Sequence, residues 1–351
     1  MTTHTATELN SPHDLLAAVP FMVGYHPQDS LVAMALREDK VVMAMRVDYP
    51  DSSSIEAISK TIALHLVREK ASEAIIVGYL PQKEIASDPL LVVRECIAGH
   101  SIIVKECIEV RSDRFRSSLC ADLTCCPPEG NLIPQLSDSR VTAEQVAAGN
   151  PLPFLDLDEM KRSIAANPTD KELIKAIKAV AEIDYESDEV NAHQLTGANA
   201  INQMALEFLR DGVVVDKALI ALVLVRLLDL QVRDYAMGIS GMGISGMGIS
   251  QEKSDDQLWD MWRWLLRVAP RGYVAPVAVI FATSSYERGD GALAQRALDR
   301  AFEDSPKYQM AKLLRRTFAA GWPPSAFTQM RADLHPKICA AIYGESPAQS
   351  E

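Results

Sequence analysis

A change of pattern near residue 140 constrains this chain most strongly. After it, apolar residues recur at helical spacing to the end of the sequence, and no strand candidate of comparable strength appears. Three capping patterns open this part: Thr142 with Gln145, Asp156 with Glu159, and Thr169 with Glu172. Further helices are expected at 172–183, 189–210, 214–235, 256–268, 275–287, 291–303, 307–319 and 325–343.

The residues before this change alternate short apolar runs with helical patterns, which is typical of an α/β domain. Strands are expected at 31–36, 41–49, 74–79 and 102–110, and helices at 15–23, behind Ser53 and Glu56, and between Asp88 and Gly99. The first two strands suit a hairpin, whereas a helix separates the last two, so we expect a mixed sheet with parallel crossovers. The sequence thus predicts an α/β domain at 1–135 followed by an all-helical domain at 136–351.

A pentad repeat interrupts the helical part, because MGISG recurs almost three times across residues 237–250. Glycine at two of every five positions opposes both helix and strand. We therefore expect a flexible loop at 237–250 that was lengthened by duplication. A functional methionine patch is the alternative.

The charge of the chain argues against a nucleic-acid partner, because 47 acidic and 35 basic side chains give a formal net charge of −12. No membrane partner is expected, since the longest apolar run, 218–225, is far shorter than the roughly 20 residues that span a bilayer. The polar start, MTTHTATELN, lacks the features of a signal peptide. We therefore expect a cytoplasmic protein with reduced thiols.

Three of the six cysteines, Cys120, Cys125 and Cys126, lie close together in the sequence. Thiolates bind zinc, but adjacent cysteines usually point apart, and a fourth ligand would have to come from elsewhere. The sequence favours structural packing of small apolar thiols, with a redox role or a zinc site as alternatives. No cofactor is predicted.

Two strand ends carry arginine and aspartate side by side. Arg46 and Asp48 share one face at the end of the second strand, because residues i and i+2 of a strand point the same way. Arg111 and Asp113 repeat this arrangement at the end of the strand at 102–110, and Arg114 follows them. These residues suit a crevice for a polar or anionic ligand at the strand ends. Ion pairs that only fix the loops are the alternative, which the sequence favours.

The loop before the first strand adds His26, Asp29 and Ser30 to the ligand-binding candidates. Asp and Ser are also ordinary turn formers, and Pro27 presets a turn. The catalytic motifs GxSxG, GxxxxGK[ST] and HExxH are absent from the sequence. No catalytic residue is therefore predicted, and the sequence leaves open whether the chain is an enzyme.

Four blocks of sequence carry a resemblance to a known family. PFMVGYHPQDSLVAMAL, RVDYP, SSLCADLTCCPPEG and ERGDGALAQRALDRAFEDSPKYQMAKLL resemble successive blocks of an actinobacterial family catalogued as domain of unknown function 4192. The resemblance covers nearly the whole chain and implies a cytoplasmic actinobacterial protein with this two-part layout. It implies no established activity, and the MGISG repeat departs from its pattern.

A second resemblance is local. Within residues 278–320, small residues and a proline fall at the spacing of one tetratricopeptide repeat: Gly289, Ala294, Leu298, Ala301 and Pro306. This resemblance implies that the helical domain at 136–351 is tetratricopeptide-like. A single repeat cannot bury its own apolar face, so it must pack on neighbouring helices.

Two functions are compatible with these patterns. The favoured one is a non-catalytic binding or scaffold protein with an unknown protein partner or with self-association, because the chain has a helical half and lacks catalytic motifs. The alternative is an enzyme or small-ligand sensor in which the strand-end residues of the N-terminal domain line a polar crevice.

Overall fold

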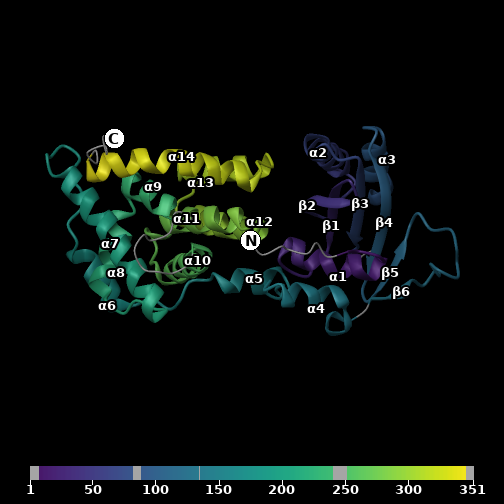
Figure 1. Cartoon of the computed structure of the whole chain (residues 1–351), viewed down its shortest axis with the longest axis horizontal. Helices are drawn as coiled ribbons and strands as arrows, with labels where there is room; N and C mark the ends of the chain where they lie inside the picture. Colours follow the sequence, from purple (N-terminus) through teal and green to yellow (C-terminus); the bar gives the residue numbers. More distant parts are fainter. Residues whose placement is uncertain (1–7, 82–87, 134, 240–250, 345–351) are drawn as a thin grey trace, which may run out of the picture. The chain divides into compact units, whose positions relative to one another are not determined.

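The computed structural model describes residues 8–81, 88–133, 135–239 and 251–344 (Figure 1). The chain divides into two compact units, Met1–Met160 and Lys161–Glu351. The first contains a six-stranded mixed sheet with helices, and the second is helical. The predicted fold class, an α/β part followed by a helical part, is confirmed.

The strands of the first unit form one sheet in the order β2-β1-β3-β4-β5-β6. They are β1 (Ser30–Arg37), β2 (Lys40–Asp48), β3 (Glu73–Tyr79), β4 (Ile103–Arg111), β5 (Arg114–Ser117) and β6 (Asn131–Leu132). β1 and β2 form the predicted hairpin, and β3 and β4 run parallel as expected for strands joined through a helix. The sequence did not predict β5 and β6.

Helices cover both faces of this sheet. α2 (Ile55–Arg68) and α3 (Pro89–Ala98) pack on the face that includes Cys107. α1 (Pro12–Val23) packs on the other face, which includes Val32. Because successive residues of a strand alternate between faces, these two cores determine where each polar side chain of the sheet points.

The start of α2 differs from the expected capping pattern of Ser53 and Glu56. Asp51 Oδ1 accepts hydrogen bonds from the backbone N–H groups of Ser53 at 3.1 Å and Ser54 at 2.9 Å, and the helix begins at Ile55. Asp51 satisfies the N–H groups that would otherwise lack partners at the helix start, so Ser53 is not needed as a cap.

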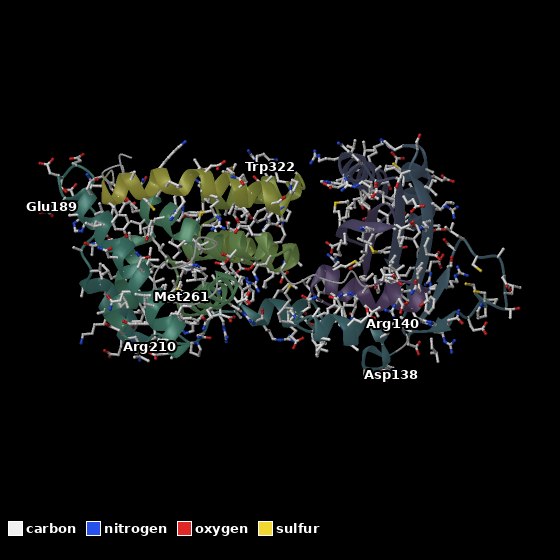
Figure 2. All side chains as sticks on the ribbon, in the orientation of Figure 1. Asp138, Arg140, Glu189, Arg210, Met261 and Trp322 are labelled. Atoms are coloured by element: carbon white, nitrogen blue, oxygen red, sulfur yellow. The ribbon has the colours of Figure 1, made fainter. Side chains whose placement is uncertain are left out.

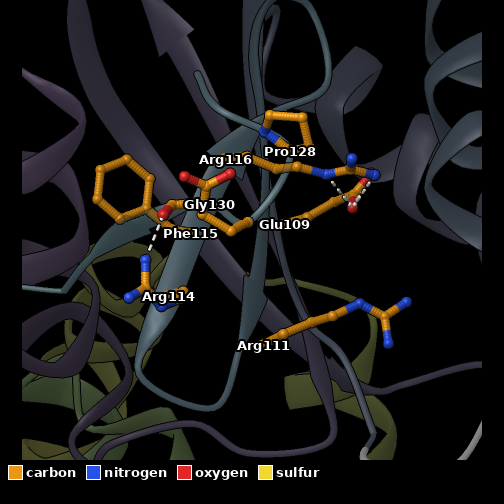
Figure 3. Close-up of a pocket in the computed structure, with 8 residues that line it drawn as sticks. Glu109, Arg111, Arg114, Phe115, Arg116, Pro128 and Gly130 are labelled. Carbon is orange, nitrogen blue, oxygen red and sulfur yellow. Dashed lines mark hydrogen bonds and ion pairs between the residues drawn. The ribbon is translucent and has the colours of Figure 1, made fainter. Parts of the chain in front are cut away.

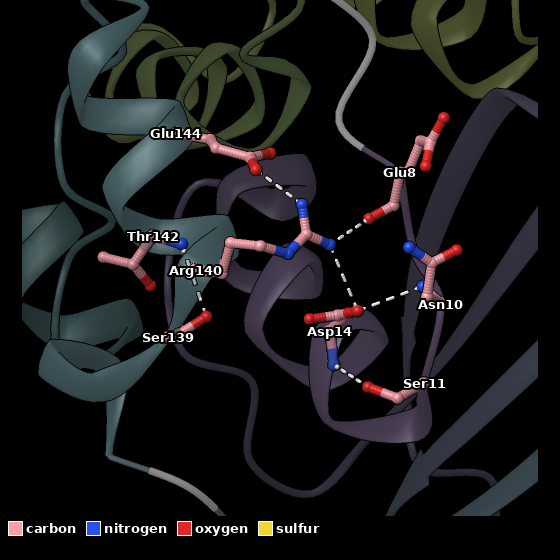
Figure 4. A network of polar contacts seen from close by, with 8 residues as sticks. All are labelled: Glu8, Asn10, Ser11, Asp14, Ser139, Arg140, Thr142 and Glu144. Atoms are coloured by element: carbon pink, nitrogen blue, oxygen red, sulfur yellow. Dashed lines mark hydrogen bonds and ion pairs between the residues drawn. The ribbon is translucent and has the colours of Figure 1, made fainter.

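α4 (Arg140–Ala147) belongs to the first unit, where the sequence placed the start of the helical domain. Arg140 Nη2 donates to Asp14 Oδ2 at 3.2 Å and to the Glu8 carbonyl oxygen at 2.6 Å, and Arg140 Nη1 pairs with Glu144 at 2.5 Å (Figure 4). Val141 also packs in one small core with residues of α1. These contacts hold α4 on α1, and the two units divide after Met160 instead of near residue 135.

α5 (Leu157–Ser163) spans this division, and the second unit continues with nine helices among its described residues. They are α6 (Lys171–Ala179), α7 (Val190–Asp211), α8 (Lys217–Arg226), α9 (Leu230–Ile239), α10 (Gln251–Val268), α11 (Val274–Glu287), α12 (Gly291–Asp304), α13 (Gln309–Ala319) and α14 (Pro324–Tyr343). Figure 2 shows Met261 inside this unit, where it is fully buried, and Glu189 and Arg210 at its periphery. None of the described helices combines the length and apolar character needed to cross a membrane.

One of the three predicted capping patterns is confirmed, because the Glu159 N–H donates to Asp156 Oδ1 at 2.6 Å. The other two are displaced from the predicted residues. Ser139 caps α4 in place of Thr142, and Asp170 caps α6 in place of Thr169.

The helix predicted at 214–235 is wrong in length, since the structure has α8 and α9 there with a break between them. Asp229 causes the break. Its carboxylate accepts hydrogen bonds from the Val232 N–H at 3.0 Å, the Tyr185 hydroxyl at 3.0 Å and Gln194 Nε2 at 3.1 Å. A buried carboxylate with these donors starts a new helix where the apolar pattern alone continues.

The end of α9 packs closely on α14. A Cβ atom added to Gly238 would lie 1.7 Å from Nδ1 of His335, so only glycine fits there without displacing the imidazole. Residues 237–239, the first three of the repeat, therefore complete a packed helix. The rest of the predicted loop, 240–250, lies outside the described residues.

Candidate functional site

The ligand-binding candidates gather at one edge of the sheet. There β2, β3 and β4 end and β1 begins, because the register aligns Asp48 with Ser30, Ser30 with Tyr79, and Tyr79 with Val110. The carboxyl ends of parallel strands are where open α/β sheets place ligands. Candidates can bind one ligand together only if their side chains also lie on the same face of the sheet.

Ser30, Arg46 and Asp48 meet on the face that α1 covers. Arg46 Nε donates to Ser30 Oγ at 2.8 Å, and Arg46 Nη1 pairs with Asp48 Oδ1 at 2.5 Å. The guanidinium also lies 6.0 Å from the ring centroid of the buried Tyr25. This arginine is thus engaged by its own neighbours, in the manner of an ion pair that fixes the strand ends.

His26 and Asp29 hold the loop before β1 through their backbones. The His26 N–H donates to the Phe154 carbonyl at 3.0 Å, and the Asp29 carbonyl accepts from the Tyr49 N–H at 2.8 Å. Burial lowers the pKa of His26 below its usual value, so its ring is neutral at pH 7.

Arg111 and Arg114 lie on the opposite face, at the turn between β4 and β5. Val110 packs with the α1 core, so its neighbour Arg111 points the other way, and the register pairs Arg111 with Arg114. β1 and β3 also separate β2 from β4, which at about 4.8 Å per strand is roughly 14 Å. The seven candidates therefore do not form the single crevice that the sequence suggested, and Asp113 lies in the turn itself.

A pocket opens beside this turn, on the face of Arg111 (Figure 3). Its volume is about 200 Å³. The described residues that line it are Glu109, Arg111, Arg114, Phe115, Arg116, Pro128, Glu129 and Gly130. The lining thus includes three arginines and two carboxylates, in a chain whose formal net charge is −12.

The three arginines differ in how much of each guanidinium is already bound. Arg116 donates through Nε at 2.9 Å and Nη2 at 2.8 Å to the largely buried Glu109 carboxylate. Arg114 donates through Nη1 to the Gly130 carbonyl at 2.8 Å. Arg111 is exposed and forms no hydrogen bond or ion pair with the residues that the structure describes. Arg111 therefore offers its whole fork of donors to a ligand.

Tyr49 brings a hydroxyl near these charges from the end of β2. Burial raises the pKa of Tyr49 above its ordinary value, the carboxylates of Asp88 and Glu109 raise it further, and Arg111 lowers it. The phenol stays protonated at pH 7, so it can donate a hydrogen bond.

The segment after the cysteines forms one wall of the pocket because of a glycine. Gly130 has a φ of 77°, which favours glycine. A Cβ there would lie 2.9 Å from the Phe115 carbonyl oxygen, so a side chain would push this segment off β5. Gly130 thus sets the close approach that encloses the pocket.

A family model described as Domain of unknown function (DUF4192) matches residues 12–325. The chain belongs to the DUF4192 family. This confirms the resemblance of the quoted blocks to that family, and the match covers most of both units of the DUF4192 chain. No curated protein and no solved structure matches it.

The cysteines of this DUF4192 chain do not pack in a core as the sequence favoured. The sulfur atoms of Cys120, Cys125 and Cys126 all lie within 4.8 Å of one another, with Cys125 exposed and the other two partly exposed. Hydrogen bonds with Cys126 and Cys120 raise the pKa of Cys125 to about 11. The adjacent cysteines, which were expected to point apart, thus belong to one cluster.

Sequence reasoning missed Glu109, Arg116 and Gly130 as site residues of this DUF4192 chain. Glu109 and Arg111 share the i, i+2 spacing that drew attention to Arg46 and Asp48, so that signal was present. Arg114 and Arg116 show it as well, but only once β5 is known to be a strand.

Proposed function

We propose that the chain is a non-catalytic binding protein whose first unit holds an anionic group at Arg111, Arg114 and Arg116. The observation that carries this proposal is the exposed guanidinium of Arg111, beside a pocket that two further arginines line. Arginine recognises carboxylate and phosphate oxygens through two parallel hydrogen bonds. It stays protonated near neutral pH, so it suits binding better than proton transfer.

The size of the pocket indicates what it holds. A volume of about 200 Å³ is below the roughly 300–1,000 Å³ of pockets for whole drug-sized ligands. It fits a phosphate or carboxylate group, either free or as the end of a larger molecule. Glu109 limits how much charge the pocket accepts, because it already neutralises Arg116.

Calorimetric titration of the full chain with inorganic phosphate and with citrate tests this proposal. We expect binding by the wild type and a loss of at least about tenfold in affinity for Arg111→Gln, because about 1.5–3 kcal/mol is typical of a hydrogen bond to a charged group. Arg37→Gln is the matched control, since Arg37 is an exposed arginine at the other end of β1. Equal affinities for the two variants would exclude the site.

The helical unit supports a second candidate function. We propose that it contacts a protein partner or a second copy of the chain, because α11 and α12 form a helical hairpin like that of a tetratricopeptide repeat, and Leu313, Trp322 and Leu334 beyond it are exposed. Light scattering during gel filtration tests self-association, which a monomer at all concentrations would exclude. A cytoplasmic location and an actinobacterial source are part of this proposal.

A further inference from the structure

The cysteine cluster lies outside the residues assigned to anion binding. Its three sulfur atoms lie within 4.8 Å of one another, and none of the three residues is buried. Free cysteine is among the residue types most often buried in proteins. Packing therefore does not explain why three partly or fully exposed thiols converge in one loop.

The backbone of the loop holds the cluster together without a core. The Cys126 N–H donates to the Asp122 carbonyl at 2.7 Å, which closes one helical turn. Asn131 Nδ2 donates to the Cys125 carbonyl at 2.8 Å, and Pro127 fixes the backbone that follows. The thiols are thus positioned before any ligand arrives, which lowers the entropy cost of binding one.

We propose that Cys120, Cys125 and Cys126 form a binding site for Zn²⁺, with three thiolate ligands and a fourth position open to solvent. Bonds of about 2.3 Å at tetrahedral angles place sulfur atoms about 3.8 Å apart. The observed limit of 4.8 Å differs from this by about 1 Å, which side-chain rotation of exposed cysteines supplies. On binding, each thiol releases its proton to solvent.

A disulfide accounts for the cluster less completely. One disulfide would join two of the three sulfur atoms and leave the third without a partner. A metal ion uses all three, and an exposed fourth position suits a water molecule or a group from a ligand. The zinc site does not depend on the anion site, so either can fail alone.

Titration of the full reduced chain with Co²⁺, after treatment with a chelator, tests the proposal. Cobalt thiolates absorb in the near ultraviolet, and tetrahedral cobalt absorbs in the visible. We expect both bands, saturation at one ion per chain, and loss of both bands when Zn²⁺ is added. Absence of the bands would overturn the proposal. A mass two hydrogens lighter after exposure to air, with no metal bound, would overturn it in favour of a disulfide.

Single variants assign the ligands. Cys120→Ser, Cys125→Ser and Cys126→Ser should each weaken Co²⁺ binding more than the roughly 10–100-fold typical of losing an outer hydrogen-bond partner of a metal ligand. Cys96→Ser is the matched control, because Cys96 is also a partly exposed free cysteine but lies on α3. Circular dichroism confirms that each variant is folded. Unchanged bands in the Cys125→Ser variant, or an equal loss in Cys96→Ser, would contradict the site.

Discussion

Arg46 and Arg111 show how neighbours decide the role of an arginine. Both lie at the same edge of one sheet, and both have a second polar residue nearby in sequence. Arg46 is satisfied by Ser30 and Asp48, whereas Arg111 has no ion pair among the described residues. The sequence predicted the pairing of Arg46 with Asp48, because two residues of one strand decide it. It could not assign the two arginines to opposite faces of the sheet, because that requires the register of four strands.

His26 gives a prediction at the same scale. Burial lowers its pKa below 6.5 in the folded chain, so the unfolded chain binds a proton first as the pH falls. The free energy of unfolding should therefore decrease as the pH falls below about 6.5, and level off below the lowered pKa. In His26→Gln this part of the decrease should disappear.

Urea unfolding at several pH values between 5 and 8, followed by circular dichroism, measures this pH dependence of the free energy of unfolding. His100→Gln is the control, because His100 is exposed. If wild type and His26→Gln have the same pH slope, burial of His26 does not perturb its titration.

Elements with strong periodicity were the most predictable parts of the fold. The hairpin, the parallel pair and most helices follow from apolar spacing, since burial of one face decides these structures. β5 and β6 were missed because they have only 4 and 2 residues, too few to show a period. The helix starts at Ser139 and Asp170 were missed because several residues near each start can cap, and tertiary contacts select one of them.

A substitution at Asp229 tests whether its buried hydrogen bonds stabilise the break between α8 and α9. Asp229→Ala removes a carboxylate that is 3% exposed and accepts from Val232, Tyr185 and Gln194. We expect a loss of about 2–3 kcal/mol in the free energy of unfolding, because buried donors are left without partners. Asp211→Ala, at an exposed ion pair with Arg210, should reduce the free energy of unfolding much less, because solvent screens an exposed pair. Equal losses in urea unfolding would show that the buried hydrogen bonds contribute nothing particular.

At the scale of the whole molecule, each unit has large buried side chains of its own. Ile62 belongs to the core on the α2 face of the sheet, and Trp262 is fully buried in the helical unit, where Gly238 also contacts His335. We therefore expect two unfolding transitions in calorimetry, one for each unit.

Variants assign the two transitions. Ile62→Ala should lower the midpoint temperature of one transition, through a loss of about 2–5 kcal/mol in the free energy of unfolding of that unit. Gly238→Ala should lower the midpoint of the other, through a loss of about 1–3 kcal/mol. Gly291→Ala should leave both in place, because an added Cβ meets nothing within 4 Å there. A single transition that moves with every variant would show that the units unfold together.

The close contact of Gly238 with His335 bears on how the number of pentad repeats can change. Tandem repeats gain and lose copies when a replicating strand slips. Here every copy begins with Met-Gly-Ile, and the copy that follows Ala236 always supplies the three residues that complete α9. A chain whose gene had lost or gained one pentad would still have glycine in contact with the imidazole of His335. The length of this stretch can therefore drift between generations while the helix end that needs glycine is preserved.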